Sequence, residues 1–413
     1  MRALNEKIDA WISEHHRWLL VGLLLAVYGT TLLLTQGLNH PIRADEEHFW
    51  ETTRDFFVQP FPPSIESLRS YRELITPLSY ILWGQLERLT GEAILAGRVV
   101  NLLMSVAVML LLAARGARPV ASLGSALGIL AYPYFIALGF HLYTDMIAGF
   151  FVVFGLHFHL RGRRWAGFVL FALAIATRQY LVQIPAAIVA WEGLCWLRDR
   201  DPARFRAAIA PGLACATLLG WIAFWGGLAP KPGLDHWVPL YPAPMMSVSS
   251  FILHYGLYYL VILGFYFAAV EALVFRELPR RETLFQPWVA VVAVALALLF
   301  WLSPPFLSGG HPGGPFGRIM RAALPGPAGD MLRITIYYVL ALFGAVRLGI
   351  AGGLALLISV LGSIMSMKSQ IPWEKYLFPC LLSLWYLRSR PDLAGGIPSV
   401  RALRSDSDDT RSP

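Results

Sequence analysis

The stretch WLLVGLLLAVYGTTLLLTQGL, residues 18–38, is long and apolar enough to cross a lipid bilayer as a helix. A polar segment precedes it and no small-residue cleavage site follows it, so we expect a retained helix rather than a cleaved signal peptide. Of the 413 residues, 56% are hydrophobic and only 15% are charged. Soluble proteins carry about 25% charged residues. The composition therefore predicts an all-α, polytopic membrane protein.

Apolar runs of similar character recur along the chain and predict about twelve transmembrane helices. These runs cover residues 18–38, 93–114, 119–140, 146–160, 165–179, 180–197, 207–228, 250–274, 287–306, 333–347, 348–367 and 373–388. The segment 74–90 is also apolar, but it has an early proline and ends in Glu87 and Arg88. If it does not cross, the basic clusters all fall on the cytoplasmic side. We therefore expect 74–90 to be an amphipathic helix on the outer surface.

This topology predicts one membrane domain, residues 18–390, with both termini in the cytoplasm. A short segment, 1–17, precedes it, and a polar tail, 391–413, follows for which we expect disorder. Three long segments, 39–92, 229–249 and the glycine- and proline-rich 307–332, then face the outside, as does the short turn 368–372. Because most of the loop sequence lies on that face, we expect the chemistry there.

Several other classes of function find little support. The net charge of +8 comes from short basic clusters between apolar runs, which indicates membrane topology rather than a nucleic-acid partner. The sequence has no GxGxxG, Walker or HExxH motif, so an ATP-driven pump and a zinc protease are not favoured. The three cysteines lack metal-binding spacing and are interpreted as packing residues. Arg98, near the outer end of its span, is interpreted as snorkelling to the surface.

An acidic cluster follows the first apolar run, in RADEEHFWETTRDFF, residues 43–57. Asp45, Glu46 and Glu47 are consecutive there, and His48 comes next. A carboxylate at the membrane surface can act as a general base towards a hydroxyl, and it can also bind a divalent cation. The alternative is an ordinary solvated loop edge.

Two further segments place polar residues at the same predicted membrane depth. GFHLYTDMIAG, residues 139–149, contains Asp145, which can bind a substrate or cap a helix. ATRQYLVQIP, residues 176–185, contains Arg178 and Gln179 within an apolar context. A guanidinium at membrane depth suits phosphate recognition. Snorkelling, or an ion pair with Asp145, is the alternative for this arginine.

Two C-terminal segments complete the set of outer-face candidates. LSGGHPGGPFGRIMRAA, residues 307–323, is a flexible stretch that can approach a ligand closely, or a simple polar hinge. MKSQIPWEKYLFP, residues 367–379, lies at the outer end of the last two spans, where a lysine–glutamate pair is often structural. The candidate residues in these segments are His311, Arg318, Lys368, Gln370, Glu374 and Lys375.

These stretches resemble the GT-C superfamily of membrane glycosyltransferases, which use lipid-phosphate-linked sugars. FHLYTDMIAGFFVV and ATRQYLVQIP are similar to the LYYTD and FRQTNI segments of the dolichyl-phosphate-glucose-dependent α-1,2-glucosyltransferases. RADEEHFWETTRDFF is similar to MDEIFHIPQAQRY of that family, with the histidine shifted by one position. The short chain, rich in arginine and alanine, suggests a prokaryotic relative in a bacterial inner or plasma membrane.

The resemblance implies an inverting hexosyltransferase with its active site on the extracytoplasmic face. It would move a hexose, such as glucose, from a polyprenyl or dolichyl phosphate to a hydroxyl of a lipid-linked glycan or another acceptor. Asp45 is then the general base and Glu46 its catalytic partner. No cofactor is required, and a divalent metal remains an option without a predicted ligand set. The expected substrate-binding residues are Glu47, His48, Asp145, Arg178, Gln179, His311, Arg318, Lys368, Gln370, Glu374 and Lys375.

Two other classes remain open. A transporter or flippase of a lipid-linked or amphipathic solute would use Asp145 and Arg178 as a charge pair inside the membrane. It also predicts repeated halves and charges near the midplane, whereas the sequence shows no internal repeat and its charges gather on one face. A non-catalytic assembly factor would not need the Asp45 carboxylate.

Overall fold

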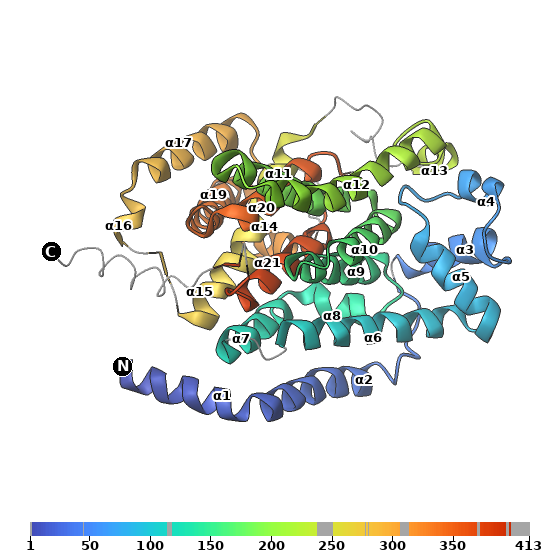
Figure 1. Ribbon diagram of the computed structural model, residues 1–413, viewed down its shortest axis with the longest axis horizontal. Helices are drawn as coiled ribbons and strands as arrows, with labels where there is room; N and C mark the ends of the chain where they lie inside the picture. Colours follow the sequence, from blue (N-terminus) through green and yellow to red (C-terminus); the bar gives the residue numbers. More distant parts are fainter. Residues whose placement is uncertain are drawn as a thin grey trace.

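The computed structural model describes residues 2–43, 45–113, 118–237, 251–276, 278–279, 281–305, 314–369, 372–393 and 396–397. Every regular element within these ranges is a helix, which confirms the all-α prediction (Figure 1). The N-terminal half contains α1 (Arg2–Leu24), the π-helical turn η1 (Leu25–Gly29), α2 (Thr30–Leu34), α3 (Glu46–Phe57), α4 (Ile65–Ser70), α5 (Leu78–Thr90), α6 (Ala93–Ala113), α7 (Pro119–Leu130), α8 (Pro133–Phe140), α9 (Thr144–Leu160), α10 (Arg164–Thr177) and η2 (Gln179–Val182). The C-terminal half contains α11 (Gln183–Asp199), α12 (Pro202–Trp225), α13 (Lys231–Trp237), α14 (Leu253–Leu263), η4 (Gly264–Ala269), α15 (Val270–Phe275), α16 (Arg281–Leu284), α17 (Pro287–Leu302), α18 (Pro315–Ala323), α19 (Gly326–Ala351), α20 (Gly353–Ser366), η5 (Glu374–Leu377) and α21 (Phe378–Ser389).

Several of these helices have the length and apolarity of membrane spans. Among the described residues, six segments qualify: Asp9–Leu34, Ile94–Ala113, Gln179–Asp199, Pro202–Trp225, Leu253–Phe275 and Gly326–Ala351. The pair α7 and α8 gives a seventh if it counts as one bent span. Four shorter apolar helices are Thr144–Leu160, Arg164–Thr177, Pro287–Leu302 and Gly353–Ser366. The chain is thus built of membrane-type helices, and the figure of twelve spans stays a prediction.

Three predicted boundaries differ from the structure. The run 119–140 is not one straight helix, because α7 and α8 meet at 76°. Pro133 begins α8 and, lacking an N–H, cannot continue the preceding helix. The boundary predicted near residue 347 moves to Gly352, where a positive φ of 63° ends α19. Finally, α18 and the first turns of α19 occupy much of 307–332, which was expected to be an outer loop.

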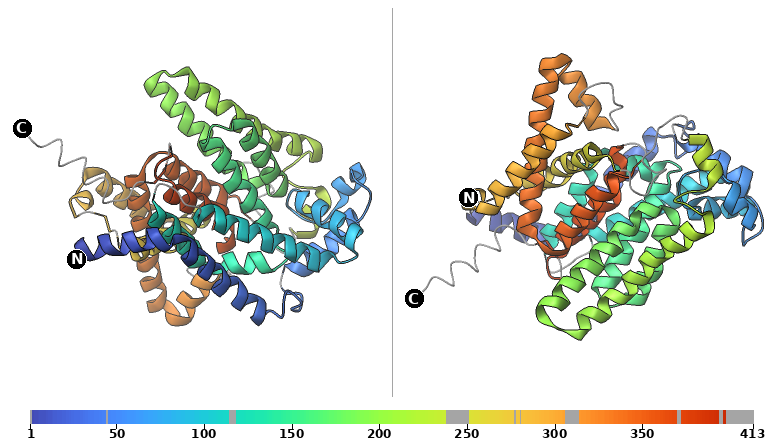
Figure 2. Two further views of the ribbon diagram at one scale, coloured as in Figure 1. Left: turned by 60° about the horizontal axis from the view of Figure 1, so that its bottom comes forward. Right: turned by 90° about the horizontal axis from the view of Figure 1, so that it is seen from above.

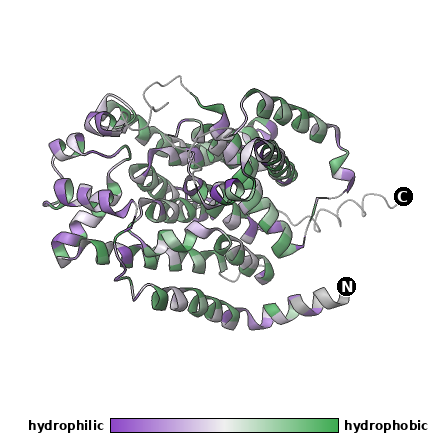
Figure 3. Ribbon diagram, turned by 180° about the vertical axis from the view of Figure 1, so that it is seen from behind, coloured by the Kyte–Doolittle hydropathy of each residue, from purple (hydrophilic) through white to green (hydrophobic). Residues whose placement is uncertain are grey.

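The first long loop folds into a helical cap at one end of the molecule. This cap, formed by α3, α4 and α5 with α13 beside them, lies away from both termini (Figures 1 and 2). Hydrophilic residues gather in it, whereas the long helices are mostly apolar (Figure 3). The amphipathic segment predicted over 74–90 corresponds to α5, which packs on α3 and α6 and buries Tyr80 and Trp83 completely.

The beginning of the tail packs on the helices. Ile397 is buried, and its N–H donates to the carbonyl of Leu387 at 3.0 Å. Disorder is therefore the wrong prediction for residues 391–393 and 396–397 of the tail. The rest of the segment for which disorder was predicted, residues 394–395 and 398–413, lies outside the described residues.

A buried ion pair fixes the cap to the bundle. The carboxylate of Glu46, the first residue of α3, accepts hydrogen bonds from Arg98 Nε at 2.9 Å and from a terminal guanidinium nitrogen of Arg98 at 2.8 Å. It also accepts the backbone N–H groups of Leu142 at 2.7 Å and Arg43 at 3.1 Å. Arg98 donates in addition to two carbonyls of the chain that leads into the cap. Because Arg98 is only 2% exposed, its interpretation as a snorkelling residue is wrong.

Replacement of Arg98 by methionine tests this anchor. We expect Arg98→Met to lower the free energy of unfolding by about 3–5 kcal/mol, because it leaves the Glu46 charge buried without its cation. Arg54 forms the matched control, since it pairs with Glu87 at 3.3 Å but is 55% exposed. Arg54→Met should cost less than about 1 kcal/mol. Unfolding of both proteins in the same detergent measures the difference, and equal losses would contradict the anchoring role.

Candidate functional site

Asp45 pairs with a lysine from the far end of the chain. Asp45 lies at the N-terminus of α3, and its carboxylate contacts the ammonium of Lys375 in η5. The two residues are 330 positions apart. The lysine side chain is almost completely buried, whereas that of Asp45 remains partly accessible. The pair therefore joins the cap to the C-terminal helices while leaving the carboxylate within reach of a ligand.

His48 lies between two carboxylates of the cap. Its Nδ1 is 2.8 Å from Glu73, and its Nε2 is 3.7 Å from Asp45. The ring of Trp237 packs edge-on against the imidazole, with centroids 5.4 Å apart. Burial disfavours the charged imidazole, but the hydrogen bonds and charges of Asp45 and Glu73 outweigh it and raise the pKa of His48 to about 9. His48 is therefore a cation at neutral pH.

Two cations thus flank the Asp45 carboxylate. Burial acts to raise the pKa of Asp45, but hydrogen bonds from His48 and Lys375 and their charges hold it well below its usual range. Asp45 is consequently ionised at all physiological pH values. Its oxygens can accept a hydrogen bond from a substrate hydroxyl, although such a stabilised carboxylate is a weak base.

The sequence-predicted partners Asp145 and Arg178 form a second buried pair. An Arg178 terminal nitrogen lies 2.8 Å from Asp145, and Arg178 Nε donates to the Thr144 hydroxyl at 2.9 Å. The ring of Tyr376 lies 5.7 Å from the guanidinium carbon. The ion-pair alternative for Arg178 is thereby confirmed. Its predicted contact with substrate stays a prediction.

Gln179 connects the cap to the helices. Its amide nitrogen donates to the carbonyls of Leu74 at 2.5 Å and Leu228 at 3.1 Å. Its amide oxygen accepts the N–H of Thr76 at 3.2 Å. The amide is fully used within the protein, so this geometry favours a structural role over the predicted substrate contact.

Glu374 binds the N-terminus of α18. One of its carboxylate oxygens accepts the Tyr258 hydroxyl and the Gly317 N–H, both at 2.8 Å. The other accepts the Tyr266 hydroxyl at 3.0 Å and the Phe316 N–H at 3.2 Å. The carboxylate is completely buried, and the first N–H groups of a helix favour an anion. Its geometry therefore fits an anchor for α18 better than a contact with substrate.

Two tyrosines at the bend between α7 and α8 hold the same segment from the other side. The Tyr132 hydroxyl donates to the carbonyl of Glu374 at 2.7 Å, and Trp373 Nε1 donates to the Tyr134 hydroxyl at 3.0 Å. Lys375 lies between these fixed neighbours, with its Nζ 3.8 Å from the centroid of the Trp373 ring. The bend thus places polar groups where they fix the lysine that faces Asp45.

The remaining predicted residues are less closely connected to this site. Glu47 and Arg318 are exposed, on α3 and α18 respectively. Lys368 is half-buried, with its Nζ 4.7 Å from the centroid of the Phe251 ring. His311 and Gln370 lie outside the described residues.

An apolar cavity of about 360 Å³ adjoins the Asp45 site. Most of its wall is apolar, and its polar or charged residues are Arg178, Gln179, Tyr180, Gln183, Tyr259, Ser366, Lys368, Ser369 and Tyr376. Two segments of the chain contact both the cavity and the site. Glu73 contacts His48 while Leu74 lines the cavity, and Lys375 contacts Asp45 while Tyr376 lines the cavity. The carboxylate site and the cavity therefore lie next to each other along these two segments.

Sequence reasoning missed three residues of this region. Glu73 stands just before the apolar segment 74–90, and Gln183 stands within the stretch that contains Arg178 and Gln179. Arg98 was interpreted as a snorkelling residue because an arginine near a helix end commonly snorkels. A single polar residue beside or within an apolar run was the available signal in each case, and it does not identify a partner.

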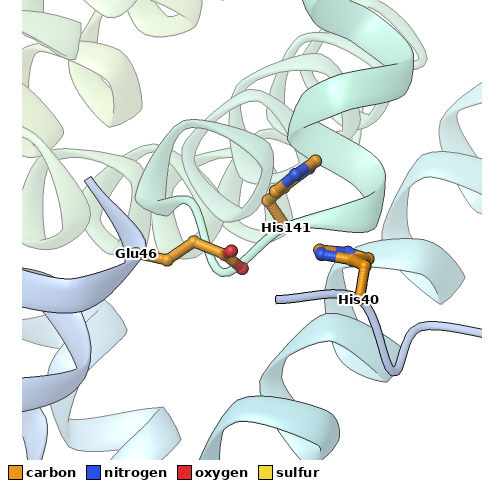
Figure 4. Close-up of side chains that lie close together, drawn as sticks. All are labelled: His40, Glu46 and His141. Atoms are coloured by element: carbon orange, nitrogen blue, oxygen red, sulfur yellow. The ribbon is translucent and has the colours of Figure 1, made fainter. Parts of the chain in front are cut away.

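A cluster of His40, Glu46 and His141 has the composition of a metal site (Figure 4). Their potential ligand atoms lie within 4.8 Å of one another. However, both Glu46 oxygens already accept hydrogen bonds from Arg98. Both ring nitrogens of His40 lie 3.0 Å from backbone carbonyl oxygens, so whichever nitrogen carries the proton donates it to a carbonyl and has no lone pair for a metal. The cluster therefore fits a hydrogen-bonded anchor better than a metal centre.

Comparisons with models of protein families, with curated proteins and with solved structures find no match. The resemblance to the GT-C superfamily accordingly stays a prediction from short motifs.

The charge of His48 predicts a pH dependence of stability. The pKa of this group rises from 6.5 to about 9 on folding, so its stabilising effect is complete below about pH 6.5 and disappears as the pH rises through about 9. We expect the unfolding temperature of the wild type to fall between pH 7 and pH 9.5, and that of His48→Gln to fall less. The exposed His236 provides the control, and His236→Gln should retain the wild-type profile. Parallel profiles for all three proteins would rule out a charged His48.

The contact of α18 with Glu374 predicts a requirement for glycine at position 314. A Cβ atom on Gly314 would lie 2.3 Å from the Glu374 carboxyl carbon, so the helix has to move away. We expect Gly314→Ala to lower the free energy of unfolding by about 1–3 kcal/mol and to speed hydrogen exchange of the Phe316 and Gly317 amides. Gly220, in α12, has no atom near such a Cβ. Gly220→Ala should leave both measurements unchanged or slightly improved, and similar behaviour of the two variants would contradict the docking contact.

Proposed function

We propose that this protein is a membrane glycosyltransferase that moves a hexose from a polyprenyl phosphate to an acceptor hydroxyl, with inversion, on the extracytoplasmic face. One observation carries the proposal. An accessible, ionised carboxylate lies beside an apolar cavity whose lining includes two cationic residues, Arg178 and Lys368. A lipid chain with a phosphate head matches the cavity, and an acceptor hydroxyl matches the carboxylate.

Asp45 is the proposed general base. The acceptor hydroxyl donates a hydrogen bond to the Asp45 carboxylate, and its oxygen attacks the anomeric carbon of the donor sugar. As the new carbon–oxygen bond forms, the bond between the anomeric carbon and the phosphate oxygen breaks. The hydroxyl becomes more acidic during this step and its proton passes to Asp45. A weak base suffices because the proton moves only when the attacking oxygen is already losing electron density.

The negative charge that develops on the leaving phosphate requires cations held in place beforehand. Arg178 and Lys368 line the cavity and are the proposed partners of this phosphate. His48 and Lys375 keep Asp45 ionised and fix its orientation. Glu46, predicted as a catalytic partner, is proposed instead to position Asp45 through its pair with Arg98. The scheme requires no cofactor, and the glycan or lipid-linked acceptor binds on the Asp45 side.

A transfer assay tests the base assignment. Purified protein is incubated with labelled polyprenyl-phosphate hexoses and a lipid extract as the source of acceptors. We expect Asp45→Asn to reduce the rate of transfer by at least about 100-fold, since loss of a general base commonly costs this much. Asp55 is exposed on the same helix, so Asp55→Asn is the matched control and should retain the wild-type rate.

The outcomes of this assay separate the classes of function. Undiminished transfer by Asp45→Asn would refute Asp45 as the base. Absence of transfer from every donor, together with movement of a lipid-linked solute across liposome membranes, would support the transporter class. Absence of both, with Asp45→Asn fully functional in cells, would support an assembly factor.

A further inference from the structure

The cavity wall contains an amide for which the described residues provide no hydrogen-bond partner. Gln183, the first residue of α11, lines the cavity and is 3% exposed as a residue. No donor or acceptor in the described part of the chain contacts its side-chain amide, whereas Gln179, four residues earlier, uses its whole amide within the protein. The amide atoms are not enclosed by protein and face the cavity, so a polar ligand in the cavity can pair with them.

The chemistry of an amide restricts that ligand. The Gln183 side chain offers both a donor, the NH₂ group, and an acceptor, the carbonyl oxygen. A hydrocarbon chain satisfies neither, and a phosphate dianion, which only accepts, leaves the carbonyl oxygen without a partner. A sugar hydroxyl both donates and accepts, and therefore satisfies the whole group.

We infer that Gln183 binds a hydroxyl of the sugar on the lipid-phosphate donor and thereby selects sugar-bearing lipids over the bare lipid phosphate. The inference rests on the proposed function. Arg178 precedes Gln183 by five residues, so the start of one helix supplies a cation for the phosphate and an amide for the sugar. The apolar wall, which includes Leu218, Ile364 and Met365, then accommodates the lipid chain.

A binding experiment tests this assignment without relying on catalysis. Wild type and Gln183→Met are placed in lipid nanodiscs free of glycoside detergents. Affinities are measured for a short polyprenyl phosphate and for the same lipid carrying a hexose. We expect the wild type to bind the hexose-bearing lipid at least about tenfold more tightly, which corresponds to one or two added hydrogen bonds. Gln183→Met should lose this preference and keep its affinity for the bare phosphate.

The stability of the free protein provides an independent readout. Methionine has a similar length without the polar atoms, so Gln183→Met should leave the unfolding temperature unchanged or raise it. Gln85 is the matched control, because its amide donates to the carbonyl of Gln59 at 2.7 Å outside the cavity. Gln85→Met should lower the unfolding temperature and keep the preference for the hexose.

Three results would overturn the inference. The first is equal binding of both lipids by the wild type. The second is an equal loss of affinity for both lipids in Gln183→Met, which would assign the amide to the phosphate or to the shape of the cavity. The third is a loss of stability as large as that of Gln85→Met, which would make Gln183 structural. A hexose preference that depends on Gln183, found in a protein without transfer activity, would support this site and refute only the proposed reaction.

Discussion

The buried pair of Glu46 and Arg98 is the constraint on which the site depends. The negative charge of Glu46, at the beginning of the cap, and the positive charge of Arg98, on α6, are both buried away from water. Separating them would leave two unpaired buried charges, which is strongly unfavourable. The adjacent residue, Asp45, is thereby fixed with its side chain towards the C-terminal helices.

A second fixed point meets the first from the opposite end of the sequence. Glu374 binds the N-terminus of α18 and two tyrosines, and its neighbour Lys375 contacts Asp45. In both segments one buried acid is an anchor and an adjacent residue, Asp45 or Lys375, faces the site. Tyr376, directly after Lys375, lines the cavity. Consecutive residues of one short segment therefore contact both the carboxylate site and the apolar cavity.

The sequence alone predicted helices and a membrane environment because both follow from local composition. It also pointed to Asp45, Asp145, Arg178 and Lys375, since charges are costly at the edge of an apolar run and stand out there. It assigned both Asp45 and Glu46 to catalysis, although the Asp45 side chain is partly accessible and Glu46 is fully buried. Adjacent residues of the same charge differ in the direction of their side chains, and that direction depends on the packing of α3 against α5 and on the pair of Glu46 with Arg98.

What the sequence determined by itself is the all-helical, apolar character of the chain and the face on which its polar residues are expected. The tertiary structure decided which charges pair, because Asp45 and Lys375 are separated by almost the whole chain and no local pattern relates them. It also decided that the run 119–140 bends and that Gln183 lines a cavity without a hydrogen-bond partner among the described residues. Whether a side chain has a partner depends on how the helices pack against one another, and this cannot be read from the sequence of one helix.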